Sequence, residues 1–252
     1  MKHLHLRIAQ MQNGIVRDLN DIHIFIRQAL PLLEDARDTH GASTHKKDRR
    51  YFVPSVGRAK VAKRTDHELR QIYERFTTQR LYEAFLITAI AEFESFLARV
   101  LRGIIREYPP KLSEGVPGVS GCKAVSAEIL LESATIDEAL DKAIADHING
   151  VFYAKPKEYL NYLSKVTGVD TEDDAFLDYL ELKATRDILV HNSHLANAIY
   201  RSKAGSKARV AIGEVLSADS TYFDNSLATL KRLSGIIKRD VERTFKPKAT
   251  VA

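Results

Sequence analysis

The last third of the chain contains the sequence Thr-Arg-Asp-Ile-Leu-Val-His-Asn at residues 185–192, near the end of a segment with helical periodicity. It places a permanently charged guanidinium, Arg186, five residues before a titratable imidazole, His191. An α-helix turns about 100° per residue, so these side chains point roughly 140° apart around the axis. They can meet only where the helix end frays, or across a two-fold axis between two copies. A purely structural interpretation is that cations in a last helical turn suit the helix dipole.

The rest of the sequence predicts helices. Apolar residues recur at three- and four-residue steps, as in helices that bury one face. We expect helices at residues 15–37, 66–108, 126–148, 156–166, 173–190 and 220–245. Pro31 is expected to kink or interrupt the first helix. The second is either one very long helix or two joined by a bend near Thr77 and Thr78. We find no alternating strand pattern, so the predicted fold class is all-α, a helical bundle.

The composition is that of an ordinary globular chain. Its 252 residues are 44% hydrophobic and 28% charged, and the formal net charge of +5 permits polyanion binding without requiring it. No apolar run approaches the length of a membrane span, and the N-terminus lacks a signal-peptide pattern, so we expect a cytoplasmic protein with no membrane contact. The single cysteine, Cys122, excludes an intrachain disulfide and a zinc site with several thiolates.

Residues 45–64 break the helical pattern and are strongly basic. This segment has eight basic residues and only one acidic residue, Asp48. Two aromatic residues, Tyr51 and Phe52, lie among the basic ones. One interpretation is a mobile arm whose cations bind phosphates while its aromatic rings stack on bases. The other is a solvated linker. The candidate RNA contacts in an arm are Lys46, Lys47, Arg49 and Arg50.

Residues 186–192 resemble the signature of the HEPN superfamily (higher eukaryotes and prokaryotes nucleotide-binding domains). Its ribonuclease members carry an Arg, four to six residues, and then a His. Here four residues separate Arg186 from His191, and Asp187 and Asn192 match the polar residue and the Asn that follow these positions in the family.

A second stretch, Ala-Glu-Phe-Glu-Ser-Phe-Leu at residues 91–97, is similar to the first core helix of the RiboL-PSP-HEPN subgroup, where an acid lies amid aromatic residues. Glu94 is expected either to pair with a cation such as Arg186 or to lie at the helix surface. The resemblance covers residues 80–245 and includes, in the family's loop order, Asn197, Tyr200, Gly205 and Gly213.

The expected organisation is an all-α bundle of HEPN type with an extra N-terminal helical segment. A helical extension at residues 1–44 and a basic linker or arm at 45–65 precede the HEPN-like bundle at 66–246. A disordered tail is expected at 247–252.

The resemblance implies a metal-independent endoribonuclease that needs no cofactor. The RNA 2′-hydroxyl would attack its own phosphate and leave a 2′,3′-cyclic phosphate and a 5′-hydroxyl. His191 would act as general base or acid, since the ordinary histidine pKa of about 6.5 suits that role. Arg186 would stabilise the phosphorane oxygens. Asn192 would orient the reacting groups, with Asp187 and Glu94 in support.

By family analogy the expected assembly is a homodimer with a composite site. Its expected partners are RNA and an antitoxin or regulatory protein, and its expected role is that of a toxin or antiviral defence effector. Two alternatives remain open: a catalytically silent HEPN module that binds RNA or nucleotide, and a helical protein-interaction domain. His194 also has two interpretations, half of a two-histidine metal site or, as we expect, a surface histidine.

Overall fold

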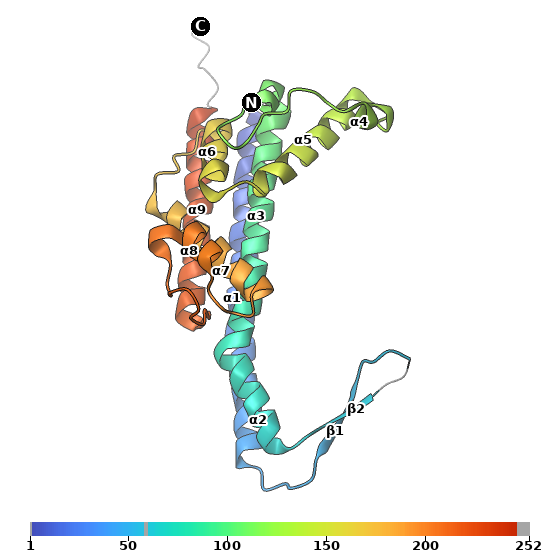
Figure 1. Cartoon of the computed structure of the whole chain (residues 1–252), viewed down its shortest axis with the longest axis vertical. Helices are drawn as coiled ribbons and strands as arrows, with labels where there is room; N and C mark the ends of the chain where they lie inside the picture. Colours follow the sequence, from blue (N-terminus) through green and yellow to red (C-terminus); the bar gives the residue numbers. More distant parts are fainter. Residues whose placement is uncertain (1, 58–59, 246–252) are drawn as a thin grey trace.

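The structure is a computed structural model that describes residues 2–57 and 60–245, so the tail predicted at 247–252 lies outside the described residues. Three long helices lie side by side: α1 (Lys2–Ala42), α3 (Leu81–Glu107) and α9 (Ser220–Thr244) (Figure 1). Apolar residues of α1, from Leu4 to Ile26, are buried in the same core as those of α3 and α9. The helix continues past Pro31, so the expected interruption does not occur.

The second predicted helix is one helical run with an irregular turn at the expected place. It consists of α2 (Asp66–Arg75), a π-helical turn η1 (Phe76–Arg80), and α3. The hydroxyls of Thr77 and Thr78 donate to the Glu74 carbonyl, which competes with the regular helical hydrogen bonds. An irregular turn within one helical run therefore lies where the sequence allowed a bend. A 3-10 helix, η2 (Pro109–Ser113), begins with the two prolines that come after α3.

The remaining helices join the long ones either directly or through a neighbouring helix (Figure 1). They are α4 (Ala127–Leu131), α5 (Ile136–Phe152), α6 (Pro156–Thr167), α7 (Asp174–His191), α8 (Ala198–Ala204) and the 3-10 helix η3 (Gly205–Lys207). The single helix predicted at 126–148 is wrong, because Thr135 starts a new helix by accepting a hydrogen bond from the Glu138 amide at 3.1 Å. No described helix is long and apolar enough to cross a membrane.

The basic segment contains a β-hairpin that the sequence did not predict. Strands β1 (Arg49–Val53) and β2 (Lys60–Arg64) pair antiparallel, with Arg49 opposite Arg64 and Val53 opposite Lys60. Most of their side chains are exposed on both faces, so the alternation of a half-buried strand is missing. Outside this hairpin the described chain is mainly helical, and the all-α class holds. Figure 1 shows the hairpin extending away from the helices, beyond α2.

Candidate functional site

Helix α7 is regular through His191. The Asn192 amide still donates to the Ile188 carbonyl, at 3.1 Å, so the helix does not fray before His191. Arg186 and His191 therefore keep their separation of roughly 140°, with a rise of about 7.5 Å along the axis. The explanation in which a frayed helix end lets the two side chains meet within one chain is wrong.

Arg186 is held half-buried beside a carboxylate. Its Nη1 donates to Asp187 Oδ1 at 3.1 Å, and Lys203 Nζ donates to Asp187 Oδ2 at 2.8 Å. Burial alone would raise the pKa of Asp187, but the hydrogen bonds from Lys203 and Arg186 outweigh it and lower that pKa. Arg186 Nε is buried and has no hydrogen-bond partner in the described chain. Asp187 thus orients the guanidinium, while the unpaired Nε is enclosed by the protein.

His191 and Asn192 lie at the end of the same helix. The His191 side chain is exposed on the last helical residue, and Asn192 is the C-cap. Asn192 Nδ2 donates to the Leu195 carbonyl, which orders the turn directly after His191. The residues around this turn expose apolar side chains: Val190 precedes His191, and Leu195 forms a β-bridge with Val215.

Glu94 pairs with a cation on α7, but that cation is not Arg186. Its carboxylate lies 2.6 Å from Lys183 Nζ, one turn before Arg186. The same ammonium lies over the rings of Phe152, Tyr159 and Tyr179, at 5.0 to 5.9 Å from their centroids. The expected pairing with a cation is therefore found, with Lys183 in place of Arg186, and it joins α3 to α7.

His194 is not a surface histidine, contrary to expectation. Its side chain is only 17% exposed, with Nε2 2.5 Å from Arg80 Nη1 and Nδ1 3.4 Å from Glu83 Oε1. Arginine only donates, so Nε2 accepts and the ring proton lies on Nδ1, facing the buried Glu83 carboxylate. Ser193 and His194 both adopt positive φ, 48° and 68°. These contacts fix the chain after His191 against η1 and α3. No local sequence pattern signals these contacts, because the partners lie more than a hundred residues away.

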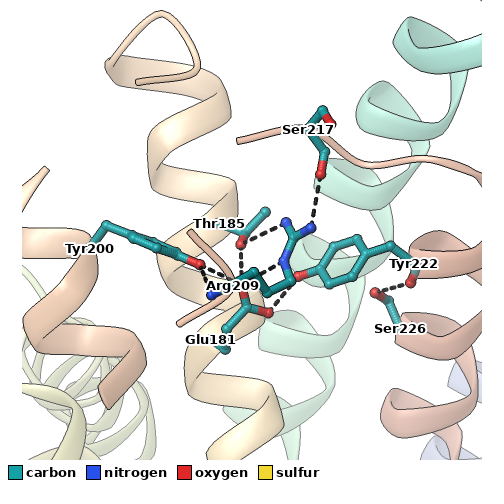
Figure 2. A network of polar contacts seen from close by, with 7 residues as sticks. All are labelled: Glu181, Thr185, Tyr200, Arg209, Ser217, Tyr222 and Ser226. Carbon is teal, nitrogen blue, oxygen red and sulfur yellow. Dashed lines mark hydrogen bonds and ion pairs between the residues drawn. The ribbon is translucent and has the colours of Figure 1, made fainter. Parts of the chain in front are cut away.

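A buried polar network fixes the other side of α7 (Figure 2). Glu181 is 4% exposed and accepts hydrogen bonds from Tyr222 at 2.6 Å, Thr185 at 2.6 Å, Tyr200 at 3.1 Å and Arg209 at 3.1 Å. The Arg209 guanidinium also stacks on the Tyr222 ring, 3.6 Å from its centroid. Burial and the Glu181 charge raise the pKa of Tyr222, so its hydroxyl stays protonated as a donor. The network ties α8 and the following loop to α7 and α9.

The four candidate RNA contacts in the basic segment divide into two kinds. Lys46, Lys47 and Arg50 are exposed. Arg49 is occupied, since its Nε and Nη2 donate to the two oxygens of Asp66 at 2.5 and 3.1 Å. Arg49 is therefore an anchor between the hairpin and the start of α2. Figure 1 places the hairpin away from α7, so these cations and the Arg186 to His191 stretch do not form one site within a single chain.

No family model, curated protein or solved structure matches this chain.

Proposed function

We propose that this protein is a metal-independent endoribonuclease that uses Arg186 and His191. The observation that carries the proposal is the combination at the end of α7. A half-buried guanidinium that is oriented by Asp187 precedes an exposed imidazole on an unbroken helix. The resemblance of residues 186–192 to the HEPN signature supports the same assignment.

The chemistry follows from what these side chains can do. His191 accepts the proton of the RNA 2′-hydroxyl, whose oxygen attacks the adjacent phosphorus. The bond from phosphorus to the 5′-oxygen of the next nucleotide breaks, and that oxygen takes a proton from water. Arg186 binds the phosphorane oxygens with a charge that does not depend on pH. The products are a 2′,3′-cyclic phosphate and a 5′-hydroxyl. Asp187 positions Arg186, and Asn192 orders the turn directly after His191.

The geometry of α7 favours a site built from two copies of the chain. One regular helix does not aim residues 186 and 191 at one phosphate. Two helices related by a two-fold axis can do so, with Arg186 of one and His191 of the other at the same cleft. The exposed Val190, Leu195 and Val215 beside the motif are apolar side chains that such an interface would cover.

The test is cleavage of a labelled RNA with and without EDTA. We expect cleavage to survive chelation and to be lost in His191→Ala and in Arg186→Ala. His67→Ala on α2 and Arg102→Ala on α3 are matched controls, because both replace exposed residues outside α7. Full activity in well-folded His191→Ala protein, or inhibition of the unsubstituted chain by EDTA, would overturn the proposal.

A further inference from the structure

The β1–β2 hairpin has two chemically different faces. Side chains alternate along a strand, and residues directly opposite each other share a face. Arg50 pairs with Lys63 and Phe52 with Val61, so these four residues form one surface, the Arg50 face. The other face carries Arg49, Tyr51 and Val53, opposite Arg64, Ala62 and Lys60.

Like charges lie directly opposite each other on both faces, which destabilises a sheet. On the second face the repulsion between Arg49 and Arg64 is relieved, because Arg49 donates two hydrogen bonds to Asp66. On the Arg50 face nothing relieves it: within residues 2–57 and 60–245, neither Arg50 nor Lys63 forms an ion pair. The cation pair of Arg50 and Lys63 therefore remains available to an anion from outside the chain.

An aromatic ring lies next to this cation pair. Phe52 is two residues along the strand from Arg50, on the same face, and its side chain is 83% exposed. Tyr51, on the opposite face, is 41% exposed. Two cations beside an open aromatic ring are what single-stranded nucleic acid requires, since phosphates bind the cations and an unstacked base covers the ring. A duplex keeps its bases stacked on each other and would leave Phe52 in water.

The hairpin is also held in a defined position. Asp66 anchors Arg49, and the neighbouring Thr65 and Glu68 form a capping box at the start of α2. Figure 1 shows the hairpin extending away from the helices, and all four side chains of the Arg50 face are exposed.

From these observations we infer that the Arg50 face binds single-stranded RNA, with Arg50 and Lys63 on successive phosphates and Phe52 stacked on a base. The choice of RNA over DNA rests on the proposed function, whereas the binding of a single strand rests on the hairpin alone. Arg49, which the sequence suggested as an RNA contact, holds the hairpin instead.

The experiment measures equilibrium binding by fluorescence anisotropy, in the full-length chain carrying His191→Ala. The probe is a labelled oligouridine, titrated at several salt concentrations. We expect Phe52→Ala to raise Kd about fivefold to a hundredfold, the range for losing one stacked base. Arg50→Ser and Lys63→Ser should each flatten the salt dependence by about 0.7 in slope, the value for one phosphate contact to a single strand. The matched controls on the opposite face are Tyr51→Ala and Lys60→Ser. They should leave the Kd and the slope of its salt dependence within twofold of the parent values.

Each other outcome has a defined meaning. Equal losses in Phe52→Ala and Tyr51→Ala would overturn the assignment to the Arg50 face. Binding to a duplex of the same length that is as tight or tighter would overturn stacking on a single strand. Competition by poly-aspartate that is as effective as competition by oligouridine would overturn it too. Tighter binding to oligothymidine would assign the face to DNA and overturn the choice of RNA. Cleavage is not measured, so a failure here is independent of the proposed activity of His191.

Discussion

At the scale of single residues, buried and partly buried carboxylates decide where several cations of this chain lie. Asp66, Glu83, Glu94, Asp187 and Glu181 each accept hydrogen bonds from, or pair with, a basic side chain. Truncating one partner of a buried pair leaves the other charge uncompensated, which costs more than the pair itself contributes. The strongest effects of substitution outside the apolar core are therefore expected at these carboxylates.

Glu181→Ala is predicted to lower the free energy of unfolding by about 3 kcal/mol, because it leaves the Arg209 guanidinium and three hydroxyl donors without their acceptor. Urea denaturation followed by circular dichroism measures the change. Glu92→Ala on α3 removes an exposed carboxylate and should stay within about 0.5 kcal/mol of the parent. Equal stabilities of the two variants would mean that the network in Figure 2 does not stabilise the fold.

The anchor of the hairpin should depend on pH. The hydrogen bond from Arg49 lowers the pKa of Asp66 in the folded chain. The stability that the ionised Asp66 carboxylate contributes is fully present above the ordinary aspartate pKa of about 3.9. It is lost as pH falls through the lower pKa of the folded chain. We therefore expect a cross-strand NOE between Tyr51 and Ala62 to persist from neutral pH down to about pH 4 and to weaken below it.

Asp66→Asn should weaken the same NOE already at neutral pH, since it removes the charge that Arg49 requires. Asp48→Asn, which removes the neighbouring exposed acid, should not. A hairpin that keeps its NOE intensity in Asp66→Asn would show that Arg49 does not anchor it.

At the scale of elements, hydrophobic periodicity located most of the helices but missed features that depend on distant residues. The place of the irregular turn at Thr77 and Thr78 was predictable, since the sequence allowed a bend there. The hairpin was not, since both of its faces are exposed. The contacts of His194 and the pairing of Glu94 with Lys183 were not predictable either, because each joins elements far apart in the chain.

The turn after α7 is predicted to depend on His194. His194→Ala removes the acceptor of Arg80 and the ring proton that faces Glu83, and should cost about 1 to 3 kcal/mol of local stability. Hydrogen exchange of the backbone amides at residues 192–196 should accelerate accordingly. His67→Ala is the control, because it removes an exposed histidine from α2. Unchanged protection at 192–196 would mean that the His194 contacts do not hold the turn.

At the scale of the whole molecule, the position of α1 in the core differs most from what the sequence suggested. The sequence suggested an N-terminal extension ahead of the bundle, whereas α1 lies against α2, α3 and α9 and shares their core. The apolar stripe of α1 predicted a buried face but not which helices would cover it. The candidate site shows the same limit: the spacing of Arg186 and His191 was readable from the sequence, while the continuity of α7 to His191 required the structure.

The central claim is that Arg186 and His191 act on one phosphate from two different chains. The most direct measurement is RNA cleavage by a co-refolded mixture of Arg186→Ala and His191→Ala proteins, each inactive alone. A mixed dimer retains one intact Arg186 and one intact His191 on separate chains, so we expect cleavage clearly above that of either parent. A mixture as inactive as its parents, with mixed dimers demonstrated in the same sample, would contradict the claim.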